Sequence, residues 1–208
     1  MSAAPTIVVT RDADVLAEAV AAAHEAGARV TAHCFAEDSL PDLLAAGIDG
    51  IEHGTGFTAA TIERAAAQGV AVVPTLVNIA TFPDLAAAGA ERFPTWSAHM
   101  LALHARRQQT VRDLHEAGVP LFVGTDAGGT LPHGLVPSEV GELVAAGLPA
   151  DVVVGAASWD ARRWLGREGL VEGAPADLLV LRTDPVLDVA TLHRPRAVVL
   201  RGRPVVAH

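Results

Sequence analysis

The chain has 208 residues, of which 50% are hydrophobic, so it has enough apolar content to bury one sizeable core with a small appendage. A formal net charge of -9 with no run of arginines argues against a nucleic-acid or anionic-membrane partner, because such partners require a basic surface. We therefore expect a small-molecule substrate or another protein as the partner.

The compartment is expected to be the cytoplasm. Cys34 is the single cysteine and cannot form an internal disulfide, and the first residues lack the charged and apolar regions of a signal peptide. No apolar stretch reaches the roughly 18 residues that a membrane span requires.

A unit recurs four times along the chain: a helix-like stretch ends at a glycine, and a short β-branched run then ends in a polar residue. The helix-like stretches are 14–26, 40–46, 59–68 and 94–117, and the runs end at His33, His53, Thr75 and Asp126. Each glycine suits a left-handed helix C-cap, and each run suits a buried parallel strand. Residues 7–10 are a further candidate strand. The alternation predicts an α/β fold with a parallel sheet.

The polar strand ends favour a barrel over an open sheet. In a (β/α)8 barrel the chemistry lies where strands end, whereas an open sheet gathers its ligands at one switch point. The units found here account for about half of the eight strands of a closed barrel, so we predict a partial (β/α)8 TIM-type barrel.

From about residue 170 the pattern changes to short alternating strands at 177–181, 197–200 and 204–206, which predict a small C-terminal β-structure. We therefore expect two domains, a partial barrel over 1–168 and the remnant of a small β-sandwich over 169–208.

Two histidines are candidate metal ligands. His33 and His53 end adjacent predicted strands, and a neutral imidazole is the commonest ligand for zinc-like metals. The alternative is a pair of hydrogen-bonded, half-buried histidines. Their equivalent places in the repeat, twenty residues apart, favour the metal.

Asp126 follows an apolar strand and precedes a glycine-containing loop. A carboxylate there can bind a metal and take a proton from metal-bound water, and the alternative is an aspartate that caps a turn. Thr75 and His133 are candidate substrate-binding residues, although an ordinary loop position is the alternative for both.

Other patterns are set aside. Residues 54–59 fit a dinucleotide-binding glycine pattern, but no acidic residue ends the following strand, and a Walker A loop requires a lysine that the chain lacks. Cys34 adjoins His33 on a strand and points to the opposite face, so we expect it to pack in the core. His99, His104 and His115 are expected on a solvated helix face.

Four segments together resemble the amidohydrolase superfamily, especially its branch of imidazolonepropionase-like enzymes and Xaa-Pro dipeptidases. They are Thr31-Ala32-His33, Gly50-Ile51-Glu52-His53-Gly54, Gly124-Thr125-Asp126-Ala127-Gly128 and Gly173-Ala174-Pro175-Ala176-Asp177-Leu178. The resemblance covers nearly the whole chain from about Asp12.

The resemblance implies that His33, His53 and Asp126 end strands five, six and eight of a (β/α)8 barrel. His33 and His53 would bind one divalent metal of a pair, with zinc the expected ion, or His33 would help to bind a single metal. Asp126 would bind a metal and shuttle the proton. The implied reaction is hydrolysis of an amide, cyclic amide, dipeptide or similar C–N bond.

The sequence departs from the family pattern in two ligands. No two of its nine histidines are separated by one residue, so the His-x-His pair of strand one is absent. The carboxylated lysine of binuclear members cannot be supplied either, and the chain resembles the C-terminal part of an amidohydrolase.

Two hypotheses follow from these departures. One is a hydrolase that obtains its remaining ligands from another chain or a complementing N-terminal segment, and the other is a non-catalytic binding or structural module. We also expect a homo-oligomer, because a half barrel exposes strand edges and an apolar face.

Overall fold

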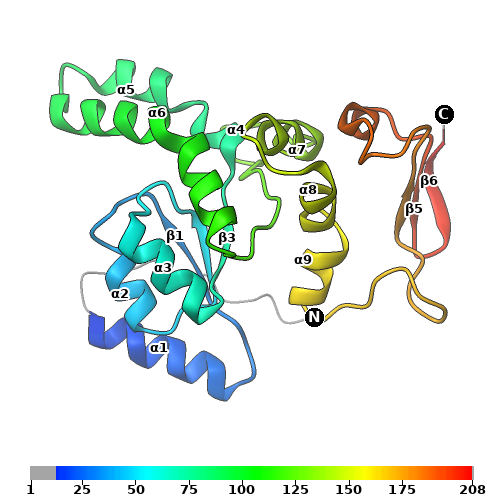
Figure 1. The fold of residues 1–208 in the computed structure, drawn as a ribbon, viewed down its shortest axis with the longest axis horizontal. Helices are drawn as coiled ribbons and strands as arrows, with labels where there is room; N and C mark the ends of the chain where they lie inside the picture. The colour runs from blue at the N-terminus through cyan, green and yellow to red at the C-terminus, as the bar shows by residue number, and fades with distance from the viewer. Residues whose placement is uncertain (1–12, 208) are drawn as a thin grey trace. The chain divides into compact units, whose positions relative to one another are not determined.

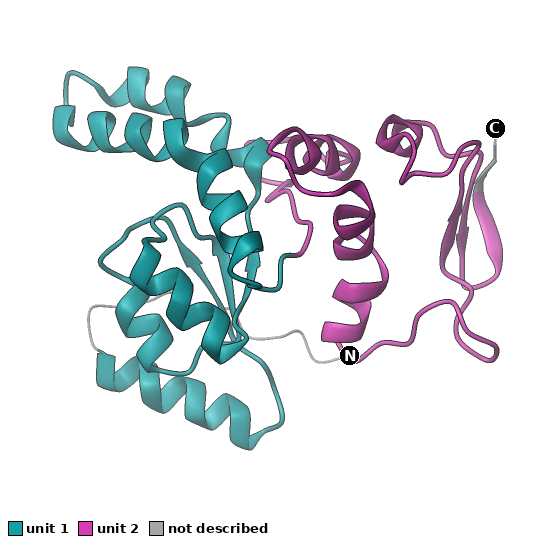
Figure 2. Cartoon of the chain, in the orientation of Figure 1, with its two compact units in different colours: residues 1–121 teal, residues 122–208 magenta. Residues whose placement is uncertain are grey.

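The computed structural model describes residues 13–207 (Figure 1). It divides the chain into two compact units, the first reaching Leu121 and the second beginning at Phe122 (Figure 2). The candidate strand at 7–10 lies outside the described residues. The predicted boundary between a barrel domain and a small β-domain after residue 168 stays a prediction.

The first unit alternates helices with short strands (Figure 1). In order its elements are α1 (Ala13–Glu25), β1 (Thr31–Cys34), α2 (Leu40–Ala45), β2 (Gly50–His53), α3 (Ala59–Gln68), β3 (Ala71–Val73), α4 (Leu76–Ile79), α5 (Phe82–Gly89) and α6 (Pro94–Glu116). This mixed α/β order confirms the fold class predicted from the repeat. The sequence did not predict α4 and α5.

Helix ends follow the chemistry expected of them. Thr58 caps α3, because its side chain accepts from the Thr61 amide while the Thr61 hydroxyl accepts from the Thr58 amide. Gly69 ends α3 in the left-handed conformation at φ 67°, as predicted for a C-cap glycine. The other repeat glycines, at 27, 47 and 118, also have positive φ.

The sheet of the first unit is parallel, in the order β1-β2-β3. The register pairs Ala32 with Ile51 and Ile51 with Val72, and all three side chains are fully buried. Leu121 adds one parallel bridge to Val72.

The strand predicted before Asp126 does not form, and a single bridge at Leu121 stands in its place. Beyond Leu121 the Val123 amide donates to the Ala156 carbonyl instead of continuing the ladder. The described sheet is open.

Helices α4 to α6 form a hydrophobic cluster of their own. Ile79, Phe82, Ala86, Met100 and Leu103 pack together, and the partly buried Phe35 packs against them.

Trp96, in the first turn of α6, lies outside the core. Trp96 is 43% exposed. Its ring lies over Gly89, where an added Cβ would be 2.6 Å from it, so it covers the end of α5 rather than entering the core.

The second unit holds helices followed by a small sheet. Its elements are α7 (Val136–Ala145), α8 (Ala150–Ala156), α9 (Trp159–Trp164), β4 (Leu178–Val180), the 3-10 helix η1 (Val189–His193), β5 (Ala197–Leu200) and β6 (Arg203–Ala207). Strands β4, β5 and β6 pair antiparallel in that order, which confirms the predicted C-terminal β-structure. Among the described helices, none has the length and apolar character needed to cross a membrane.

Candidate functional site at the strand ends

The two predicted metal-binding histidines lie together at one edge of the parallel sheet. His33 is the last residue but one of β1, and His53 is the final residue of β2. Their ring centroids are 4.8 Å apart, with the planes inclined at 76°. His33 is exposed and His53 is buried, so the pair has one face toward solvent.

The backbone of His53 explains how its ring reaches His33. The register pairs Cys34 with His53 and places His33 opposite Glu52. In a regular strand alternate side chains point to opposite faces, so His53 would share the face of Cys34 and point away from His33. Instead φ of His53 is 68°. Rotation from the usual value of about −120° turns Cβ to the other side of the strand.

Left-handed backbone recurs at the candidate residues. Among the described non-glycine residues, positive φ occurs at His53 (68°), Thr75 (50°), Asp126 (53°) and Arg201 (50°). Such conformations cost about 1–3 kcal/mol each and cluster at functional sites, and a β-branched residue such as Thr75 is an outlier there. Three of these four residues are candidate site residues, and their functional roles stay predictions.

Thr75 supports His53 directly. Its Oγ1 lies 2.6 Å from Nδ1 of His53, and both residues are buried. When Nδ1 carries the ring proton it donates to Thr75 Oγ1, and Nε2 is then the nitrogen that can bind a metal. The expected contact of Thr75 with substrate stays a prediction, and its position beside the imidazole was not foreseen.

Phe35 is a site residue that sequence reasoning missed. Its ring centroid lies 4.4 Å from that of His33 and 4.5 Å from that of His53. On its other side it contacts Phe82 at 5.0 Å. The ring therefore joins the imidazole pair to the hydrophobic cluster of α4 to α6. The only signal in the sequence was an aromatic residue just after the strand.

Asp126 and His133 lie in the second unit, on one loop. The Gly128 amide donates to the Leu131 carbonyl at 2.9 Å and tightens the turn between them. A Cβ added to Gly128 would lie 3.0 Å from Cε1 of His133, so that ring packs on the loop that follows Asp126. Both side chains are exposed. Their catalytic and substrate-binding roles stay predictions.

A zinc-type ion takes three or four protein ligands. The His33 and His53 imidazoles are donors of the right chemistry. Within residues 13–207, however, no group of three or more His, Cys, Asp or Glu side chains is arranged to hold a metal. The described residues therefore offer a ligand pair and not a whole site.

Cys34 does not complete the set. Its thiol donates to the Ala36 carbonyl at 3.2 Å, and burial raises the pKa of the thiol to about 11. This agrees with the prediction that Cys34 packs in the core.

A cavity of about 510 Å³ lies elsewhere in the first unit, between α3 and α6. Phe57, Ile62, Arg106 and Asp113 are among the residues that line it. None of the candidate site residues lines it, so it is separate from the histidine pair.

Comparison with known proteins identifies the family. The model of the amidohydrolase family matches residues 2–205. Uncharacterized proteins of Mycobacterium bovis and Mycobacterium tuberculosis are 53% identical over 190 residues, which is 91% of this chain and 51% of theirs. The chain thus spans about half the length of the curated relatives it matches.

Solved structures agree. An amidohydrolase is 29% identical with a TM-score of 0.79, over 95% of this chain and 49% of its own. A prolidase solved with N-methylphosphonate-L-proline is 26% identical with a TM-score of 0.77, over 96% of this chain and 50% of its own. The chain belongs to the amidohydrolase family.

Proposed function

We propose that this chain forms part of a metal-dependent hydrolase that cleaves C–N bonds in an amide, cyclic amide or dipeptide. The observation that carries the proposal is the contact between the His33 and His53 rings, which depends on a left-handed His53. Likeness to a prolidase favours a substrate with a prolyl amide bond. Such a substrate is a small molecule, in keeping with the acidic net charge of -9.

The fold proposed for this function is a partial (β/α)8 barrel. Strands β1, β2 and β3 run parallel in chain order, and Leu121 bridges to β3 in the same direction. Consecutive parallel strands with helices between them are what part of such a barrel contains.

Each residue has a distinct proposed role. A bound zinc-type ion would polarise the scissile carbonyl and acidify a water molecule. His33 and His53 would hold that ion, and Thr75 would keep the His53 ring in one tautomer. Asp126 would accept and return the proton, and His133 would contact the substrate from the loop after Asp126.

A purely structural module is the weaker reading. Such a module gives no reason to hold His53, Thr75 and Asp126 in costly left-handed backbone. Natural structures tolerate that cost where geometry serves a reaction or a ligand.

The remaining metal ligands are proposed to come from a second polypeptide segment. The sequence has no His-x-His pair and no lysine, and the described residues bring together only two imidazoles as metal donors. A complementing N-terminal segment with a His-x-His pair would complete the set.

Reconstitution tests the proposal. The chain is mixed or co-expressed with the part of the Mycobacterium tuberculosis relative that it does not match, and release of proline from Xaa-Pro dipeptides is measured. We expect turnover that requires both polypeptides and zinc, and loss of turnover in Asp126→Asn with metal content largely kept. Turnover by the 208-residue chain alone that His33→Ala abolishes would overturn the two-part site. Turnover unaffected by Asp126→Asn would remove Asp126 from its role.

A further inference from the structure

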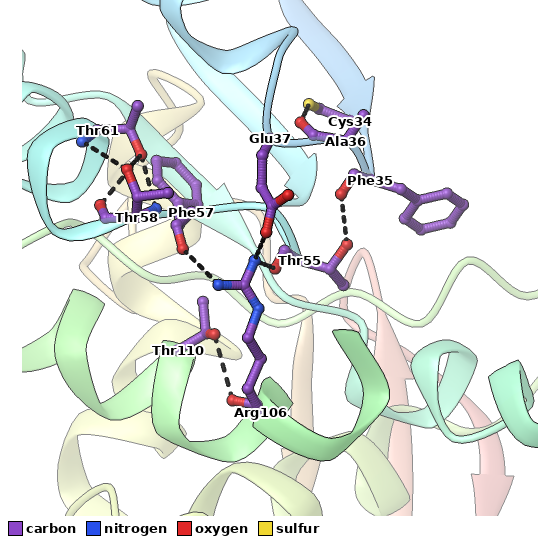
Figure 3. A network of polar contacts seen from close by, with 10 residues as sticks. All are labelled: Cys34, Phe35, Ala36, Glu37, Thr55, Phe57, Thr58, Thr61, Arg106 and Thr110. Carbon is purple, nitrogen blue, oxygen red and sulfur yellow. Dashed lines mark hydrogen bonds and ion pairs between the residues drawn. The ribbon is translucent and has the colours of Figure 1, made fainter. Parts of the chain in front are cut away.

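Arg106 on α6 joins three parts of the first unit (Figure 3). Its Nη2 donates to Glu37 Oε1 at 2.6 Å and to the Thr55 carbonyl at 3.0 Å. Its Nη1 donates to the Phe57 carbonyl at 3.4 Å. One guanidinium therefore connects α6 with the loop after β1 and the loop after β2.

These two loops are the ones that directly follow the histidine pair. The Thr55 hydroxyl donates to the Phe35 carbonyl at 2.9 Å, which links the second loop to the first (Figure 3). The backbones also touch at Gly56, where an added Cβ would lie 2.6 Å from the Ala36 carbonyl carbon and the Glu37 nitrogen. The two loops are thus joined at the backbone of Phe35 and Ala36.

Phe35 in turn contacts both imidazoles. Helix α6 also supports its ring from behind through the cluster that contains Met100 and Leu103. Helix α6 therefore holds Phe35 in two ways, at its ring by packing and at its backbone through Arg106.

From this arrangement we infer that Arg106 is a positioning residue for the histidine pair and acts through Phe35. The inference deepens the proposed function. Metal binding by the two histidines rests on that function, whereas the contacts of Arg106 and Phe35 do not. The guanidinium suits this task because its planar fork reaches several acceptors at fixed angles, which an ammonium group does not.

The ion pair itself contributes little to global stability. The side chains of Arg106 and Glu37 are 35% and 43% exposed, and ion pairs at such positions are weak because water screens them. Removal of Arg106 also removes its hydrogen bonds to the Thr55 and Phe57 carbonyls, so we expect Tm to fall as well. The readout that separates positioning from a merely structural role is therefore the geometry of the imidazole rings.

The test measures the chemical shifts of the two imidazole rings in protein without metal. The Hε1 and Hδ2 chemical shifts of His33 and His53 are measured in histidine-labelled protein, and Phe35→Leu defines the ring-current contribution of Phe35. In Arg106→Gln we expect at least half of that contribution to be lost in protein that is still folded. Arg106→Lys should give an intermediate loss, because lysine keeps the charge but not the fork.

A control in the second unit is Arg163→Gln. The Arg163 guanidinium pairs with Asp160 within α9 at 2.8 Å and is 76% exposed, so the histidine shifts should not move. Thr55→Val is a second route to the same effect, because it removes only the hydroxyl that holds the Phe35 carbonyl. It keeps the inference testable if Arg106→Gln does not fold.

Unchanged histidine shifts in both Arg106→Gln and Thr55→Val, with a clear change in Phe35→Leu, would overturn the inference. A second arm measures Co²⁺ affinity, which we expect to fall about 10–100-fold in Arg106→Gln, as for other residues that support a ligand. If wild type bound no Co²⁺ but the shift changes occurred, the proposed function would fail and the positioning by Arg106 would stand.

Discussion

Replacement of Thr75 by valine exchanges the hydroxyl group for a methyl group and changes almost nothing else. Threonine and valine have the same shape and the same β-branch, so the left-handed strain at φ 50° is unchanged. What disappears is the buried 2.6 Å hydrogen bond between Oγ1 and Nδ1 of His53.

The expected loss of unfolding free energy is about 1–3 kcal/mol, the cost of a buried polar group deprived of its partner. Thr75→Ser is the matched control, because it keeps the hydroxyl and removes only a buried methyl group, worth about 0.8 kcal/mol. If the hydrogen bond contributed nothing, valine would match wild type and be more stable than serine.

Urea unfolding gives the free energies, and the ¹⁵N shift of Nδ1 in His53 reports the tautomer. We expect Thr75→Val to be destabilised and to change that shift, and Thr75→Ser to keep the wild-type shift. A Thr75→Val protein with wild-type stability and an unchanged Nδ1 shift would refute the role assigned to Thr75.

Three further outcomes are expected. Cys34 is buried, and its thiol pKa is raised to about 11. It should therefore react with iodoacetamide far more slowly than a model thiol at pH 8, and its rate should rise as the pH approaches 11. Fast alkylation of folded protein would contradict its burial. Gly56→Ala should lose about 1–3 kcal/mol of stability, since its Cβ would meet the Ala36–Glu37 backbone, whereas Gly141→Ala, in open space on α7, should gain about 0.5–1 kcal/mol. Sedimentation at micromolar concentration should show self-association through the open sheet edge, and a compact monomer would argue against it.

The repeat in the sequence predicted most of the first unit. Helix ends came out within one residue of the expected 14–26, 40–46, 59–68 and 94–117, because each glycine ends a helix in a conformation that only a residue without Cβ adopts cheaply. The strands ending at His33 and His53 followed the same rule. The strand before Asp126 did not form as expected, since the Val123 amide pairs with Ala156, a contact that no local pattern announces.

The polar residues of the candidate site were predictable from the sequence. The contacts that hold them in place were not. A histidine at a strand end is visible in the sequence, but the conformation that turns His53 toward His33 depends on residues beyond the strand. The contacts of Phe35 and Arg106 join residues 35, 55 and 106. Residues so far apart in the sequence show no periodic pattern that would predict their contact. Thr75 was found by position alone, and its bond to His53 required the fold.

Metal binding by the histidine pair tests the account most directly. Untagged protein is loaded with zinc, dialysed and analysed for metal in wild type, His33→Ala, His53→Ala and the control His99→Ala, which changes an exposed histidine on α6. With two imidazoles as the donors brought together, we expect less than one equivalent in wild type and His99→Ala, and a marked loss in both His33→Ala and His53→Ala. Equal zinc in all four proteins would contradict the claim that His33 and His53 form the metal-binding pair.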